Sequence, residues 1–90
     1  MAGERVALVT GAAGGIGRAT CARLAADGWL VAVADLNGDA ANSVAAGLGG
    51  KHRGYRADVR DEAAVIGLFA AVDAELGAVT ALVFDAGGRP

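Results

Sequence analysis

A glycine-rich stretch constrains the fold of this chain more than any other feature. Residues 10–17 read Thr-Gly-Ala-Ala-Gly-Gly-Ile-Gly and directly follow an apolar run at residues 6–9. A buried strand that ends in such a turn and leads into a helix is typical of folds that bind dinucleotides. Gly11 allows the tight bend, Gly15 lets a diphosphate approach the backbone, and Gly17 lets the helix pack closely. The helix N-terminus adds free N–H groups for phosphate oxygens.

A second apolar run strengthens this interpretation. Glycine-rich turns alone are a weak signal, because glycines also cap helices and form loops. Residues 30–34 read Leu-Val-Ala-Val-Ala and end in Asp35. Folds of this type place an acidic side chain at this distance from the turn, where its carboxylate binds the ribose hydroxyls of adenosine. The turn and Asp35 together therefore predict a dinucleotide site.

The composition indicates one small globular domain over residues 1–90. More than half of the residues are apolar, and the formal net charge is −2. This mildly acidic balance argues against a nucleic-acid partner. No apolar run approaches the ~18 residues of a membrane span, and the N-terminus lacks the profile of a signal peptide. We therefore expect a cytoplasmic protein with no membrane partner.

The single cysteine and the single histidine point to structural roles. Cys21 cannot form a disulfide within the chain and is expected to be a small core residue. His52 is expected to be a loop residue. The two lie far apart in the sequence, so their spacing predicts no metal site.

Apolar runs and helical periods alternate along the chain. We expect strands at residues 5–10, 30–35, 53–57 and 80–84, and helices at residues 15–27, 39–48 and 61–76. Strands joined by helical crossovers form a parallel sheet with right-handed connections. The prediction is an α/β fold, a partial Rossmann fold whose four-stranded parallel sheet has the order 3-2-1-4.

Residue spacing supports the expected helices. The first helix has Ile16, Ala19, Thr20 and Leu24 at helical spacing, and Asn37 or Asp39 is expected to cap the second. The third helix has the clearest period, which is formed by Val65, Leu68, Phe69, Val72 and Leu76.

With these motifs in place, the sequence resembles the N-terminal part of the short-chain dehydrogenase/reductase family over nearly its whole length. The family's Thr-Gly-x-x-x-Gly-x-Gly turn and its acidic residue after the second strand are both matched. An Asp-Val pair after the third strand borders the adenine in the family. The resemblance implies cofactor-binding roles for Thr10, Gly11, Gly15, Ile16, Gly17, Asp35, Leu36, Asp58, Val59, Ala86 and Gly87.

The fourth family motif, Asn-Asn-Ala-Gly, is matched only in part. Ala86 and Gly87 agree, whereas Phe84 and Asp85 replace the two asparagines. A phenylalanine cannot make the amide hydrogen bonds of an asparagine, and a carboxylate can only accept them. The replacements predict a local difference in how the fourth strand is tied to its neighbours.

The catalytic residues of the family have no match in this sequence. Its members use a serine and a Tyr-x-x-x-Lys pair beyond the fourth strand to move hydride between a nicotinamide and an alcohol or ketone. Ser43 lies in the second helix, and Val59 rather than a lysine stands four residues after Tyr55. Lys51 precedes that tyrosine. We therefore expect the N-terminal cofactor-binding half of such an enzyme, truncated before the catalytic segment and inactive alone.

The cofactor is predicted from Asp35. Its carboxylate accepts hydrogen bonds from the ribose of NAD but repels the 2′-phosphate of NADP. In the family, NADP-dependent members commonly carry a basic residue at positions that hold Gly14 and Leu36 here. NAD is therefore favoured over NADP, and an alcohol or ketone substrate is expected only for a full-length form.

Two other interpretations remain open at this stage. The chain could instead be a non-catalytic nucleotide-binding or interaction module. A methyl-donor-binding enzyme shares the turn and the acidic residue, but it does not predict Thr10 together with Ala86 and Gly87. Leu82 and Val83 would be covered by later elements in a complete fold, so we expect self-association through the open sheet edge.

Overall fold

Strands and helices alternate along the whole of the described chain. The structure is a computed structural model that describes residues 5–84. Its elements are β1 (Val6–Thr10), α1 (Gly15–Ala26), β2 (Leu30–Asp35), α2 (Gly38–Leu48), β3 (Arg53–Arg56), α3 (Glu62–Glu75) and β4 (Val79–Phe84). Each expected element is present, and the bounds differ from the prediction by one residue at some ends.

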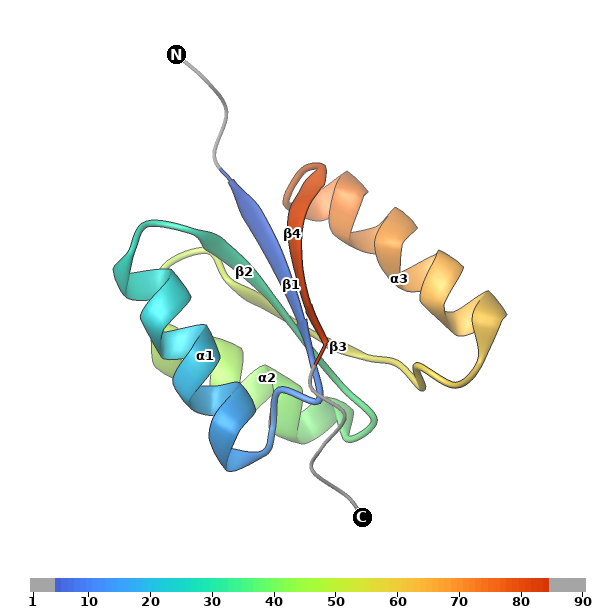
Figure 1. Ribbon diagram of the computed structural model, residues 1–90, viewed down its shortest axis with the longest axis horizontal. Helices are drawn as coiled ribbons and strands as arrows, with labels where there is room; N and C mark the ends of the chain where they lie inside the picture. Colours follow the sequence, from blue (N-terminus) through green and yellow to red (C-terminus); the bar gives the residue numbers. More distant parts are fainter. Residues whose placement is uncertain (1–4, 85–90) are drawn as a thin grey trace.

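The four strands form one parallel sheet in the order β3-β2-β1-β4, as predicted (Figure 1). β1 pairs with β2 from Val6 opposite Leu30, and its other edge pairs with β4. All residues of β1 are buried. Because every strand runs the same way, the carboxyl ends of β1, β2 and β3 lie at one edge of the sheet, where folds of this type bind ligands.

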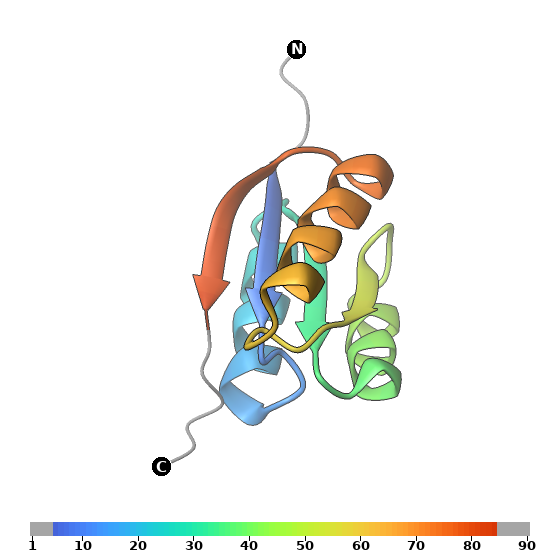
Figure 2. The ribbon, with the colours of Figure 1, turned by 90° about the vertical axis from the view of Figure 1, so that its right-hand side faces the viewer.

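The helices cover both faces of the sheet. α1 and α2 lie on one face, and α3 lies on the other (Figures 1 and 2). The core under α1 and α2 contains Val9, Cys21, Val31, Val33 and Val44. The core under α3 contains Leu8, Ala32, Ala34, Leu68 and Val72. The continuous apolar runs of β1 and β2 are explained by this burial on two sides.

The predicted role of Cys21 is confirmed. Its side chain is fully buried against the sheet, and no disulfide forms among the described residues. Burial raises the pKa of the Cys21 thiol to about 11. The thiol therefore stays protonated at neutral pH and behaves as a small core side chain.

The residues at helical spacing in α1 do not all face the core. Ile16 is 76% exposed and Ala19 is also exposed, whereas Gly17 and Cys21 are the buried residues of this helix. Thr20 and Leu24 are half-buried. The helix turns Gly17 inward because only a residue without a Cβ fits at its closest approach to the preceding turn.

Side-chain caps fix where α2 and α3 begin. Asn37 caps α2, because its Oδ1 accepts a hydrogen bond from the N–H of Ala40 at 3.0 Å. Asp61 caps α3 by accepting from the N–H of Ala63 at 3.0 Å. Such caps satisfy N–H groups that have no partner within the helix.

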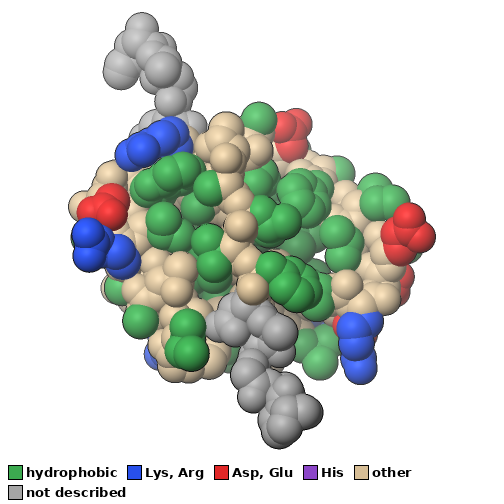
Figure 3. Space-filling view, viewed as in Figure 1, with side chains coloured by type: hydrophobic (Ala, Val, Ile, Leu, Met, Phe, Trp, Pro, Cys, Tyr) green, Lys and Arg blue, Asp and Glu red, His purple; other side chains and the backbone are tan. Residues whose placement is uncertain are grey.

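Apolar side chains gather over β4 and toward α3 on one face of the molecule (Figure 3). Leu82 is 54% exposed and Phe84 is 61% exposed, and Ile66 on α3 is 63% exposed. β4 is an edge strand of the described sheet, so this face and this edge are open together.

No helix within residues 5–84 is long and apolar enough to cross a membrane.

His52 completes the hydrogen bonding of β2 where β3 has not yet begun. Its Nδ1 accepts a hydrogen bond from the backbone N–H of Val31 at 3.0 Å. The N–H of Leu30 donates toward β1, so the N–H of Val31 faces the β3 side, and β3 pairs with β2 only from Arg53 onward. The ring therefore replaces a missing carbonyl of β3. His52 is a loop residue as expected, but its side chain has a structural bond that the sequence did not predict.

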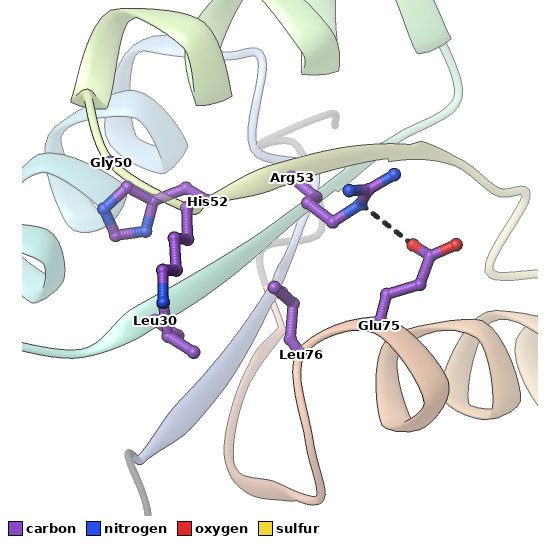
Figure 4. A pocket seen from close by; sticks show the side chains of 7 residues that line it. Leu30, Gly50, His52, Arg53, Glu75 and Leu76 are labelled. Atoms are coloured by element: carbon purple, nitrogen blue, oxygen red, sulfur yellow. Dashed lines mark ion pairs between the residues drawn. The ribbon is translucent and has the colours of Figure 1, made fainter.

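The surroundings of this ring favour its neutral form. His52 lies beside Leu30, Arg53, Glu75 and Leu76 around a cavity of about 460 Å³ (Figure 4). Burial lowers the pKa of His52. A protonated Nδ1 cannot accept the bond from Val31, so protonation and this bond exclude each other.

The His52 bond predicts a stability that depends on pH. The contribution of this bond to stability is fully present above the ordinary histidine pKa of about 6.5, and it is lost as the pH falls toward the lower pKa of the folded state. We expect the loss of the bond to lower the free energy of unfolding by at most about 1 kcal/mol between pH 7 and pH 5, because the ring is partly exposed. Denaturant titrations of the wild type and His52→Asn test this, since the asparagine oxygen can accept the same bond without titrating. An equal pH dependence in both proteins would contradict it.

Candidate functional site

The glycine-rich turn lies between the end of β1 and the start of α1. Gly11 has φ of +65°, a left-handed conformation that favours glycine. A Cβ at residue 17 would lie 2.6 Å from the Gly11 oxygen and 2.6 Å from the Ala12 Cα. The close approach of α1 is therefore to the turn itself. Gly17 was predicted to bring the helix close to the sheet, and the structure locates the contact at this turn.

Gly15 stands in a different environment. A Cβ built there would meet no other atom within 4 Å, so the described residues leave open space at the first residue of α1. No side chain caps this helix, and its first turn carries no acidic residue. The open space and the uncapped N–H groups fit a diphosphate at the positive end of the helix dipole.

Asp35 lies at the end of β2 and contacts the turn directly. Its Oδ1 accepts a hydrogen bond from the N–H of Ala13 at 3.2 Å, and its Oδ2 accepts one from the N–H of Asn37 at 3.0 Å. The structure thus brings together the predicted ribose-binding residue and the predicted diphosphate-binding turn. Ala13 was not singled out from the sequence, because its contribution is a backbone N–H group that no side-chain pattern reveals.

Three large apolar side chains are exposed around the same edge of the sheet. Ile16 follows β1, Leu36 follows β2 and is 53% exposed, and Val59 follows β3 and is 37% exposed. All three were among the residues that the sequence assigned to cofactor binding. Each of these side chains follows the carboxyl end of a different strand, at the edge where folds of this type bind ligands.

Two further candidate residues lie at this edge with different surroundings. Thr10 is buried, and its hydroxyl has no hydrogen-bond partner among residues 5–84. Asp58 is bound by Arg60, whose Nε and Nη2 donate to the two carboxylate oxygens at 3.0 and 3.1 Å. Hydrogen bonding from Arg60 lowers the pKa of Asp58. Arg60 was not singled out from the sequence, and its guanidinium binds both oxygens of this predicted cofactor residue.

The remaining predicted cofactor residues, Ala86 and Gly87, lie outside the described residues, as does Asp85.

Tyr55, which the sequence excluded from catalysis, is held in a structural contact away from the glycine-rich turn. Its hydroxyl donates to Glu75 at 2.7 Å, and Glu75 also forms an ion pair with Arg53 at 3.0 Å. Burial and this carboxylate raise the pKa of Tyr55 well above its usual value. Its proton is therefore held in place at neutral pH.

Within residues 5–84, the glycine-rich turn and Asp35 lie together at the carboxyl edge of the sheet. Among the same described residues, no group of His, Cys, Asp and Glu side chains is suited to a metal ion.

A family model described as short chain dehydrogenase matches residues 5–90. The chain belongs to this family. Short-chain dehydrogenases are oxidoreductases that bind nicotinamide cofactors, either NAD or NADP.

Individual short-chain dehydrogenases match nearly all of this chain. This chain is 48% identical over 86 residues to D-threitol dehydrogenase of Mycolicibacterium smegmatis, and the match covers 92% of this chain and 33% of that relative. It is 42% identical over 83 residues to a 2-dehydro-3-deoxy-L-rhamnonate dehydrogenase (NAD(+)) of Sphingomonas, and this match covers 92% of this chain and 33% of the relative. The chain therefore spans about a third of the length of these relatives.

Solved structures agree with this family assignment. Sorbitol-6-phosphate 2-dehydrogenase from Erwinia amylovora matches with a TM-score of 0.84 at 38% identity, over 88% of this chain and 33% of that one. Menthone neomenthol reductase from Mentha piperita matches with a TM-score of 0.82 at 28% identity, over 93% of this chain and 32% of that one. The fold is therefore the Rossmann fold of short-chain dehydrogenases.

Proposed function

We propose that this chain is the N-terminal, cofactor-binding half of an NAD-dependent short-chain dehydrogenase. The bound nicotinamide would supply hydride chemistry on an alcohol or ketone, with acid/base residues from a segment beyond residue 90. The observation that carries the proposal is the bond between Asp35 and Ala13, which joins the ribose-binding carboxylate to the glycine-rich turn. The 90-residue chain alone is then a binding unit without oxidoreductase activity.

The charge of Asp35 supports NAD over NADP. A 2′-phosphate on the ribose would stand close to this carboxylate, and two like charges at ~4 Å repel by about 4 kcal/mol at an effective dielectric constant near 20. Solvent screening reduces this repulsion but leaves its sign unchanged. Leu36 follows Asp35 in the sequence and offers no positive charge to a phosphate. One relative of this chain has NAD(+) in its name.

Replacing Asp35 by alanine tests the cofactor choice. We expect the wild type to bind NAD at least about tenfold more tightly than NADP, and Asp35→Ala to lose most of this preference. Titration calorimetry with both cofactors measures the ratio of the dissociation constants. Asp39→Ala is the matched control, because it removes an equal charge four residues away in the first turn of α2. An unchanged ratio in Asp35→Ala would overturn the assignment of NAD.

A non-catalytic nucleotide-binding or interaction module is the second candidate function. The exposed apolar side chains of Leu82, Phe84 and Ile66 beside the open edge of β4 favour it, because such surfaces pair with other chains. A reading frame that continues into a serine and a Tyr-x-x-x-Lys segment would support the enzyme. A frame that stops at residue 90 would support the module.

The same surface predicts self-association of the isolated chain. We expect dimers or larger species in sedimentation velocity at micromolar concentrations, because an unpaired parallel edge strand and an apolar face are exposed together. Leu82→Lys introduces a charge on this face and should shift the population toward monomer. Ala22→Lys, at an exposed position of α1, should not. A sharp monomer peak for the wild type would contradict the prediction.

A cytoplasmic location is also part of the proposed function, and it rests on the family and on the composition.

A further inference from the structure

Asp35 has a second role in addition to the ribose contact proposed above. Both of its carboxylate oxygens accept backbone hydrogen bonds, from Ala13 in the turn and from Asn37 beyond β2. A carboxylate offers about four acceptor positions, so a ribose diol can bind while both bonds remain.

The turn is joined to β2 at two successive residues. The N–H of Ala12 donates to the backbone oxygen of Ala34 at 3.0 Å, and the N–H of Ala13 donates to the side chain of Asp35 at 3.2 Å. Ala12 thus extends the sheet bonding by one residue. Beyond that point the turn leaves the sheet, and among the described residues the carboxylate of Asp35 accepts its one further hydrogen bond to β2.

The peptide groups of Ala13 are held from two sides. Its N–H is bound by Asp35, and its oxygen accepts a hydrogen bond from the Nε of Arg18 at 3.2 Å. One anionic and one cationic side chain therefore fix Ala13, two residues before Gly15, where the open space for a diphosphate lies. Hydrogen bonds to charged groups are stronger than neutral ones, so this pair restrains the turn before a ligand arrives.

We propose that Asp35 is a positioning residue for the glycine-rich turn, and that it links ribose recognition to diphosphate binding through the N–H of Ala13. Restraining the turn in its binding conformation lowers the entropy that a ligand must remove. Loss of the carboxylate then weakens binding of the diphosphate itself, even where a ligand has no ribose hydroxyls. The effect on ligand binding rests on the proposed nucleotide site. The restraint of the turn by Asp35 does not depend on that proposal.

The restraint is tested without a ligand by hydrogen exchange of single amides, followed by NMR on the 90-residue chain. In Asp35→Ala we expect the Ala13 amide to exchange roughly tenfold faster than in the wild type, because it loses a charge-assisted bond. The Ala12 amide is the internal control, since its partner is a backbone oxygen that the substitution leaves in place. Asp35→Asn should keep Ala13 protected, because the amide oxygen still accepts. Equal exchange of Ala13 in the wild type and in Asp35→Ala would overturn the proposal, and so would acceleration in Asp35→Asn equal to that in Asp35→Ala.

The coupling is tested with two probes, ADP and 2′,3′-dideoxy-ADP, which differ only in the ribose hydroxyls. Asp35→Ala should weaken both, the dideoxy compound by roughly three- to tenfold, while Asp39→Ala weakens neither. Weakening of ADP alone, with dideoxy-ADP unchanged, would show that Asp35 acts on the ribose only and would overturn the coupling. Failure of the wild type to bind either probe would refute the proposed nucleotide site, and the exchange of Ala13 would still decide whether Asp35 restrains the turn.

Discussion

Gly17→Ala is expected to lower the free energy of unfolding by about 2–3 kcal/mol, which is a large share of the stability of a domain of this size. The new Cβ would lie 2.6 Å from both the Gly11 oxygen and the Ala12 Cα, which are backbone atoms that cannot rotate away. Either α1 or the turn must shift. Because the turn carries the proposed diphosphate site, nucleotide binding should fall together with stability.

Gly15→Ala should separate the two effects. Its Cβ meets no atom of the chain within 4 Å, so the free energy of unfolding should stay the same or rise slightly. The methyl group would occupy the space assigned to the diphosphate, so nucleotide affinity should fall by roughly tenfold or more. Gly47→Ala in α2 also has open space around it and serves as the control, with increased stability and unchanged binding.

Thermal unfolding and nucleotide titration of these three variants test the two roles. A loss of ~2 kcal/mol lowers the melting temperature by roughly 10 °C in a chain of about 90 residues. A Gly17→Ala protein as stable as the wild type would contradict the close approach of α1 to the turn. A Gly15→Ala protein with unchanged affinity would contradict the location of the diphosphate.

Gly54→Ala is expected to have a comparable effect at the other side of the sheet, with a loss of about 2–3 kcal/mol. A Cβ at this position of β3 would lie 2.6 Å from the backbone nitrogen of Asn42 and 2.7 Å from the carbonyl carbon of Ala41. α2 therefore crosses β3 in direct contact with its backbone. An added methyl group would push the helix away from the strand and loosen the core that Ala41, Val44 and Ala45 form.

Denaturant unfolding of Gly54→Ala measures this loss, and Gly67→Ala is the matched control. Gly67 lies in α3 with no atom within 4 Å of an added Cβ, so its substitution should stabilise the chain by about 0.5–1 kcal/mol. Nucleotide affinity, corrected for the unfolded fraction, should change less in Gly54→Ala than in Gly17→Ala, because Gly54 is not part of the glycine-rich turn. Equal stability of the two variants would contradict the packing of α2 on β3.

The fold could be predicted from the sequence because local and global signals agree. The apolar runs at residues 6–9 and 30–34 predicted the strands β1 and β2, and the helical period of α3 was correct at Leu68 and Val72, which are buried. The buried face of α1 could not be predicted, because close packing decides it. The residues at helical spacing include Ile16, but the close contact at Gly17 leaves Ile16 exposed.

The candidate site could be predicted as residue types but not as a connected structure. Asp35 and the turn were identified by spacing, which follows from the geometry of a strand, a turn and a helix. Their direct bond could not be predicted, because it uses the backbone N–H of Ala13. The ion pair of Arg60 with Asp58 and the bond of His52 to Val31 also depend on how loops fold back on the sheet.

Calorimetric titration of the 90-residue chain with NAD tests the central claim most directly, with circular dichroism on the same sample to establish that the chain is folded. We predict saturable binding of one NAD per chain, because the turn, Asp35 and the exposed apolar side chains at the carboxyl edge of the sheet are all present within residues 5–84. A folded chain that gives no binding heat and no change in melting temperature with NAD would contradict the claim that this part of the protein holds the cofactor by itself.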